Sequence, residues 1–181
     1  VYDPHAFSIV SDVLSAFPQI SWLTGMAAIR NSAGQIVRCR QPHPYHRNLF
    51  RCGAYGDRLF ALQQESTFWR TDLNTLVDMK RLAHLKLAGD FFLWWSFAAE
   101  KELYVVQAFL SAFTFEDDQL SRREPGAYQA ELRSIAREPT LAERWAILRQ
   151  RRPQRRMIPR LSVPRSVFWD IDRECWRLDR E

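Results

Sequence analysis

Apolar side chains at intervals of three and four open the chain. Between residues 6 and 17 they fall on one helical face behind Asp3-Pro4, a favourable helix start, and Pro18 ends the run. Residues 20–24 are mostly apolar and stop at Gly25. This pattern predicts a helix followed by a short buried strand.

A hairpin and a loop are expected next. Residues 26–30 and 35–39 flank a tetrapeptide that ends in Gly34, which predicts a β-hairpin with a positive φ at Gly34. Residues 41–63 are polar and interrupted by Pro and Gly, so we expect a loop with one short helix near 45–51.

The centre of the chain holds an unusually apolar segment. After a helix expected over 71–77, residues 89–99 predict a second helix that is apolar nearly all round. Such a helix is stable only when most of its surface is buried. Residues 103–106 and 108–115 predict two strands after it.

Three amphipathic helices are expected after residue 121. Their apolar faces hold Tyr128, Leu132 and Ile135; Leu141, Trp145 and Leu148; and Phe168, Ile171, Cys175 and Leu178. The expected fold class is therefore α/β. A mixed sheet with flanking helices over 1–121 is followed by a helical, Arg-rich tail over 122–181.

Composition fits a packed domain with a basic end. Of the 181 residues, 46% are apolar, and wholly apolar stretches are far shorter than the ~20 residues that span a bilayer. The net charge of +5 divides into −1 over 1–121 and +6 over 122–181. Seven Arg and no acid lie from Arg149 to Arg165, which suits phosphate, an anionic membrane or nucleic acid. A solvated basic tail is favoured, because Arg outnumbers Lys 23 to 3, and no nucleic-acid partner is expected without an aromatic binding signature.

The cysteines and histidines do not predict a disulfide framework or a metal site. The three cysteines form no Cys-x-x-Cys pair, and their odd number argues against a disulfide framework or zinc knuckle, so a reducing, cytoplasmic location is expected. The pair His43-x-x-His46 lies beside prolines without a third ligand at suitable spacing, which favours a polar loop over a metal site. The chain starts at Val1 without Met or a secretory signal, so we expect it to begin inside a longer reading frame.

Asp90 is the main candidate for a catalytic residue in this sequence. It follows Gly89 in the predicted first turn of the apolar helix, where free backbone N–H groups and the helix dipole favour a carboxylate. Asp90 is either the N-cap of this helix or a general base with a pKa set by partial desolvation against the dipole. Its position alone does not decide between the two.

Four segments, in order, resemble one enzyme family. They are an opening from Tyr2-Asp3-Pro4 to Gly25, then Q-E-S-T-F-W-R at 64–70, A-G-D-F-F-L-W at 88–94, and L-S-A-F-T-F at 110–115 with Q-L-S at 119–121. This series is similar to the C-terminal half of the family-2 inverting glycosyltransferases, which have the GT-A fold. The resemblance covers 1–121 without large gaps, and implies a partial GT-A-like sheet there.

The resemblance implies a role for Asp90. In the family, an A-x-D-x-x-L-W segment supplies the base that deprotonates an acceptor hydroxyl. That hydroxyl attacks the anomeric carbon of a nucleotide-sugar and inverts its configuration. The resemblance also places a set of residues at the substrate: Gln64, Glu65, Trp69, Arg70, Gly89 and Trp94.

Alternatives stay open for several of these residues. Gln64 and Glu65 would lie beside the donor sugar or the acceptor, and turn or cap hydrogen bonding is an equal alternative for each. Trp69 is the better candidate for stacking on a sugar, because a pyranose C–H face matches an aromatic face. Trp94, inside the apolar helix, is better explained as core.

Two departures from the family bear on metal and nucleotide binding. The late His of the family aligns with Glu116, whose carboxylate suits Mg²⁺ or Mn²⁺, although a solvated acidic turn is favoured because Asp117 and Asp118 follow. The acidic metal motif and the nucleotide-binding half of the family would precede Val1. A divalent cation is therefore expected only in the intact enzyme, and the chain alone is expected to be inactive.

Three classes of function remain open on the sequence. The first is the acceptor half of a glycosyltransferase, with a nucleotide-sugar donor, a glycan acceptor and contact of the basic tail with the inner face of the membrane. The second is a non-catalytic interaction module that uses the fold and the basic tail. An acidic pair and about 90 residues of βα pattern upstream of Val1 would favour the first, and a start codon the second. The third, a small nucleic-acid-binding protein, depends on residues 149–165 alone.

Overall fold

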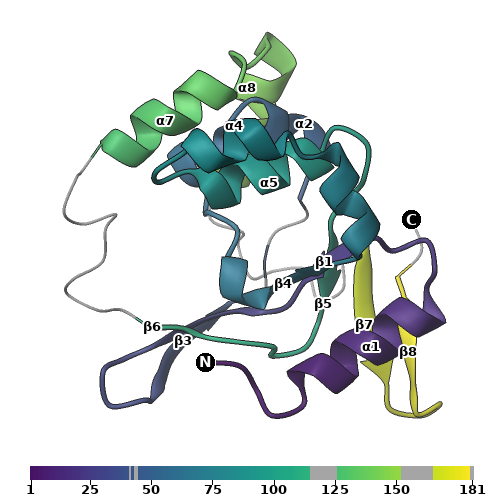
Figure 1. Cartoon of the computed structure of the whole chain (residues 1–181). Coiled ribbons are helices and arrows are strands. Elements are labelled where there is room, and N and C mark those ends of the chain that lie inside the picture. The colour runs from purple at the N-terminus through teal and green to yellow at the C-terminus, as the bar shows by residue number, and fades with distance from the viewer. Residues whose placement is uncertain (41, 43–44, 115–125, 152–164, 180–181) are drawn as a thin grey trace.

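Figure 1 shows a computed structural model of the chain, which has two small sheets and helices on both sides of the larger one. The structure describes residues 1–40, 42, 45–114, 126–151 and 165–179. The larger sheet has the strand order β4–β1–β5–β7–β8, and the smaller has the order β3–β2–β6. These strands are β1 (Trp22–Thr24), β2 (Ala27–Arg30), β3 (Ile36–Arg40), β4 (Thr67–Trp69), β5 (Tyr104–Val106), β6 (Phe113–Thr114), β7 (Ser166–Asp170) and β8 (Cys175–Leu178).

Helices lie on both faces of the larger sheet. They are α1 (Ala6–Ala16), α2 (Arg47–Arg51), α3 (Ala54–Asp57), α4 (Met79–His84), α5 (Gly89–Phe97), α7 (Ala127–Ile135) and α8 (Leu141–Arg151), with the 3₁₀ helices η1 (Gln64–Ser66) and η2 (Thr71–Leu76). In Figure 1, α2, α4, α5, α7 and α8 gather on one side, and α1 lies on the other, beside β7 and β8. The α/β class expected from the sequence is confirmed.

Strand β1 separates two hydrophobic cores. It pairs antiparallel with β4 and parallel with β5. Because successive side chains of a strand point to opposite faces, Trp22 belongs to the core under the helical layer and Leu23 to the core under α1. Both side chains are fully buried. The strand predicted over 20–24 thus has its apolar residues on both faces, which is why it shows no alternation.

Helix α5 forms the centre of the larger core. Phe91, Phe92, Trp94 and Phe97 are all nearly inaccessible to solvent, and together they cover most of the helix circumference. The prediction of a helix buried on most of its surface is confirmed. Burying such aromatic side chains contributes roughly 2–3 kcal/mol each to the hydrophobic free energy of folding.

The amino-terminal end of α5 is capped by α7 rather than by its own sequence. The carboxylate of Glu131, on α7, accepts the backbone N–H groups of Lys86 at 2.8 Å, Leu87 at 2.7 Å and Ala88 at 2.6 Å. Partial burial raises the pKa of Glu131, but these hydrogen bonds outweigh that effect and hold the pKa below its ordinary value. This contact fixes α7 against the first turn of α5.

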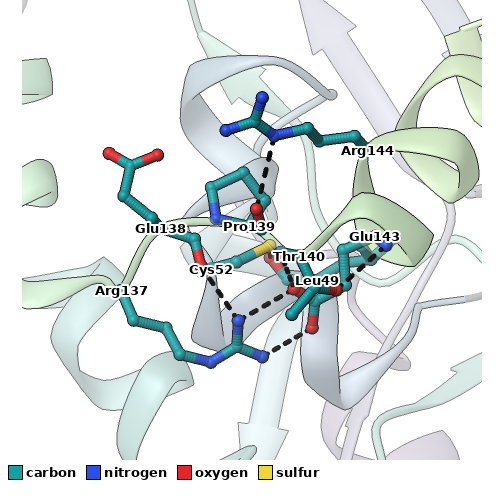
Figure 2. Close-up of polar contacts among 8 residues, drawn as sticks. All are labelled: Leu49, Cys52, Arg137, Glu138, Pro139, Thr140, Glu143 and Arg144. Carbon is teal, nitrogen blue, oxygen red and sulfur yellow. Dashed lines mark hydrogen bonds and ion pairs between the residues drawn. The ribbon is translucent and has the colours of Figure 1, made fainter.

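Helix α8 is held by a buried carboxylate at its start. Arg137 donates to both carboxylate oxygens of Glu143, at 2.8 and 2.5 Å (Figure 2). Thr140 and Glu143 also form a reciprocal capping box, in which the Thr140 N–H donates to Glu143 Oε2 at 2.8 Å and the Glu143 N–H donates to Thr140 Oγ1 at 3.3 Å. The hydrogen bonds from Arg137 lower the pKa of Glu143 to about 2. The ion pair stays formed across the neutral range.

The prediction of a last amphipathic helix over Phe168–Leu178 is wrong. Strands β7 and β8 form an antiparallel hairpin there, and β7 pairs parallel with β5. The Val-Phe-Trp run of β7 favours a strand, and pairing with β5 buries Val167 completely. Ile171, expected on the helix face, lies at the hairpin turn and is 81% exposed.

Other predictions have mixed outcomes. The helix over 6–17 and the hairpin with a positive φ at Gly34 are confirmed. The helix over 71–77 is a 3₁₀ helix. Of the strand predicted over 108–115, residues 113–114 form β6 and Ser111 makes a single bridge to Tyr2, while residue 115 lies outside the described residues. The loop over 41–63 carries a second short helix, α3.

The proposed boundary at 121 and most of the basic run 149–165 lie outside the described residues. Among the helices that the structure describes, none is long and apolar enough to cross a membrane.

Candidate active site

Asp90 lies half-buried in the first turn of α5. The N-cap residue is Ala88, so the interpretation of Asp90 as the N-cap is wrong. Asp90 Oδ1 instead accepts the N–H of Phe91 at 2.7 Å. The carboxylate therefore uses one free N–H of the first turn and leaves the cap itself to Glu131.

The surroundings of Asp90 raise its pKa. Burial is the main cause, and the negative charge of Glu65 adds to it, while hydrogen bonds from Phe91 and Tyr128 offset part of the rise. Asp90 is the one described carboxyl group for which a raised pKa is resolved; those of Glu131, Glu143 and Asp170 are lowered. A carboxylate with a raised pKa is a stronger proton acceptor than an exposed one.

Tyr128 is the direct side-chain partner of Asp90. Its hydroxyl, which α7 brings to the start of α5, hydrogen-bonds the Asp90 carboxylate. Burial raises the pKa of Tyr128, and the charge of Asp90 raises it further, so the phenol keeps its proton and is the donor. The sequence placed Tyr128 on an apolar helix face and gave no sign of this contact.

Gly56 leaves space beside the Tyr128 hydroxyl. A Cβ atom at Gly56 would lie 3.5 Å from Tyr128 Oη and 3.1 Å from Leu132 Cδ1. Gly56 also has a φ of 106°, which L side chains rarely adopt. Two features therefore favour glycine at this position: the positive φ and the short distance to side chains of α7.

The two tryptophans of the predicted site pack against each other. Trp94 is 2% exposed and stacks on Trp22 at a centroid distance of 5.9 Å, so its interpretation as core is confirmed. Trp69 is half-buried and meets Trp94 edge to face at 5.7 Å. The Trp69 Nε1–H donates to Asn74 Oδ1 at 3.0 Å, which fixes the orientation of the indole.

Arg70 lies apart from Asp90, on the α1 side of the sheet. Its guanidinium donates to the carbonyl oxygens of Ile20 at 2.9 Å and Leu14 at 2.5 Å. These contacts fasten the end of α1 to β4. In the described structure the guanidinium holds the fold together rather than facing the Asp90 carboxylate.

The remaining predicted residues take varied positions. Gln64 is exposed and Glu65 half-buried on η1, and of the two only Glu65 acts on the pKa of Asp90.

Gln63, next to them, was not predicted to have a role. Its amide group exchanges two hydrogen bonds of 3.1 Å with the backbone of Ala28 and so ties η1 to β2. A Cβ at Gly89 would meet only Leu82 Cδ1, at 3.5 Å, which is ordinary contact.

The metal assignment concerns residues that the structure does not describe. Glu116, Asp117 and Asp118 lie in the segment 115–125, outside the described residues. Within the described part of the chain, no three His, Cys, Asp or Glu side chains converge in a way that would hold a metal ion. Asp90 and Glu65 are a single pair of carboxylates and do not by themselves make such a site.

Comparisons with known proteins found no relative of this chain. No family model, no curated protein and no solved structure matches this chain.

Proposed function

We propose that the chain is the acceptor-side half of a family-2 inverting glycosyltransferase and that Asp90 is its general base. In this proposal the intact enzyme transfers a sugar from a nucleotide-sugar to a hydroxyl of a glycan acceptor. The single observation that carries it is the Asp90 carboxylate, which combines a raised pKa with a place at the start of a buried helix. The resemblance of the segments 64–70 and 88–94 to the family supplies the reaction class.

The chemistry asked of Asp90 is one proton transfer. The carboxylate accepts the proton of the acceptor hydroxyl as its oxygen attacks the anomeric carbon, and the bond from that carbon to the nucleotide diphosphate breaks. Tyr128 donates to Asp90 throughout, so it orients the carboxylate and keeps one of its oxygens in place. Glu65 disfavours the ionised form of Asp90 and thereby strengthens it as a base.

Further parts of the enzyme belong to the same proposal. The nucleotide-binding half and the acidic metal motif, with Mg²⁺ or Mn²⁺, would be supplied from upstream of Val1. The cation, when bound, would offset charge on the leaving diphosphate. Work on a cytoplasmic nucleotide-sugar, at or near the inner face of the membrane, follows from this assignment.

The decisive experiment replaces Asp90 by Asn in the full-length enzyme. General-base catalysis contributes typically 10²- to 10⁴-fold, so turnover should fall by about that factor while donor binding, measured by calorimetry, stays within about twofold. Asp72→Asn, at an exposed position in the first turn of η2, is the matched control and should leave turnover unchanged. Unchanged turnover in Asp90→Asn would contradict the proposal.

A further inference from the structure

Helix α8 turns an apolar stripe toward solvent. Leu141, Trp145 and Leu148 are 77%, 66% and 51% exposed, although their spacing of four and three residues puts them on one helical face. The opposite face carries Ile147 and Glu143, which are nearly inaccessible to solvent. The helix therefore has a narrow face in the core and a second apolar face outside.

Arginines border this stripe on both sides. With about 3.6 residues per turn, Arg144 and Arg151 project to one side of the Leu141–Trp145–Leu148 line and Arg149 to the other. All three side chains are exposed. We call these six residues, Leu141, Arg144, Trp145, Leu148, Arg149 and Arg151, the α8 face.

The α8 face carries no acidic charge of its own. The one carboxylate of α8 is Glu143, which is turned inward and neutralised by Arg137. The exposed carboxylate of Glu138 precedes the helix, and in Figure 2 it extends to the opposite side of Pro139 from Arg144. Along the sequence, no acid follows Glu143 until Asp170.

The face is formed before it meets a partner. The Thr140–Glu143 capping box and the Arg137 ion pair fix the start of α8, and Ile147 anchors its middle in the core. Binding would therefore not have to order this helix, which removes one common cost of association. Figure 1 shows α8 at the far side of the helical layer from the amino terminus, with its outer surface clear of the sheets.

We propose that the α8 face docks on the surface of an anionic lipid bilayer. Trp and Leu on one face, bordered by Arg, are the features of a helix that lies in the membrane interface with its apolar face among the upper acyl chains. Trp145 is suited to the headgroup level, since its ring is apolar and its N–H polar. The three arginines complement acidic headgroups, and this charge complementarity favours lipid over a neutral protein surface. The proposal does not depend on the glycosyltransferase assignment.

The experiment is sedimentation of the full chain with vesicles. Vesicles of phosphatidylcholine mixed with phosphatidylserine should bind the chain, vesicles of phosphatidylcholine alone should bind it much more weakly, and added salt should release it. Replacing Arg144, Arg149 and Arg151 by Gln should weaken partitioning by about a hundredfold, at about fivefold for each charge removed. Replacing Arg38, Arg40 and Arg58, exposed elsewhere, by Gln removes the same charge and should have a much smaller effect.

The apolar part of the face has its own test. Trp145→Ala should weaken binding about tenfold, whereas Trp169→Ala, at a 46% exposed position on β7, should not. Far-UV circular dichroism should be the same for all variants, because each replaced side chain is exposed.

Three results would overturn the proposal. One is no binding to anionic vesicles, and another is an equal loss in the two arginine triples, which would mean that overall charge and not the α8 face acts. The third is self-association in sedimentation equilibrium that Trp145→Ala abolishes, which would assign the face to a second copy of the chain.

Discussion

The hydrogen bond between Tyr128 and Asp90 joins residues that lie far apart in the sequence and is one of several influences on the pKa of the candidate base. The phenol favours the ionised form of the carboxylate, while burial and Glu65 disfavour it. Burial is the larger influence, so the pKa stays above that of an exposed aspartate. The hydrogen bond from Tyr128 therefore limits how far the pKa of Asp90 is raised.

Replacing Tyr128 by Phe removes the hydroxyl and keeps the ring. We expect the pKa of Asp90 to rise further, because one hydrogen bond to its charged form is lost. Carboxyl ¹³C chemical shifts measured against pH in the chain itself report this value directly. Tyr104→Phe, at a half-buried position under α1, is the control and should leave the titration of Asp90 in place. A lower pKa in Tyr128→Phe would contradict the role given to the hydroxyl.

The sequence predicted part of the candidate site and not the rest. Asp90 was found because a lone carboxylate beside an apolar helix is conspicuous, and Trp94 was assigned to the core because the helix around it is apolar on every side. Tyr128, Gly56 and the contacts of Arg70 with Leu14 and Ile20 were not predictable. Each depends on which elements meet in three dimensions, and local periodicity carries no such information.

The helices after residue 126 are fastened to the rest of the molecule by carboxylates. Glu131 supplies the cap that the sequence before α5 lacks, and Glu143 closes the start of α8 through Thr140 and Arg137. Both carboxyl groups have lowered pKa values. The docking of these helices is thus sensitive to acid.

Loss of the Glu131 cap should destabilise the fold. In Glu131→Ala the N–H groups of residues 86–88 lose their acceptor, and a lost helix cap costs about 1–2 kcal/mol. Urea denaturation should show a lower midpoint with an unchanged slope. Glu100→Ala, exposed just beyond α5, should leave the midpoint unaltered, and an equal midpoint in Glu131→Ala would show that water replaces the cap at no cost.

Glu143 should make stability depend on pH in a defined window. Its pKa is about 2 in the folded chain against an ordinary 4.5, so its contribution is complete above pH 4.5 and is lost as pH falls toward 2. Urea midpoints measured across this window should decline less steeply in Glu143→Gln than in the wild type. Glu138→Gln, an exposed neighbour, should follow the wild type. Parallel declines in all three chains would contradict the prediction.

Element types were predictable where one pattern dominated. The hairpin around Gly34 and helix α5 have strong local signals, and both are confirmed. Residues 168–178 carry apolar side chains at helical spacing, which predicted a helix. Instead, β7 pairs with the edge of β5 and buries Val167, and this long-range pairing outweighs the local pattern. In α8, the stripe Leu141–Trp145–Leu148 was correctly placed on one face, but which face enters the core depends on Glu143 and Ile147.

Over the whole molecule, the first and last parts of the chain share one sheet. β5, from the segment before residue 121, is flanked by β1 on one side and by β7 on the other. Val167 of β7 also completes the core under α1. The two segments predicted as separate regions are therefore joined by backbone pairing and by a common core.

We expect the chain to unfold as one unit. Tryptophan fluorescence and far-UV circular dichroism should give coincident urea transitions, because neither segment retains a closed core without the other. A chain cut after residue 121 should show no cooperative transition. Two separated transitions, or a cooperative transition in the shortened chain, would support independent domains instead.

The position of β7 between β5 and β8 has a consequence for synthesis. A ribosome makes the chain from its amino terminus, so β1, β4 and β5 emerge well before the strand that covers the remaining edge of β5. Until Ser166–Asp170 have been translated, the nascent polypeptide presents an open strand edge and a gap under α1. Until β7 covers it, that edge is open to pairing with a strand of another chain.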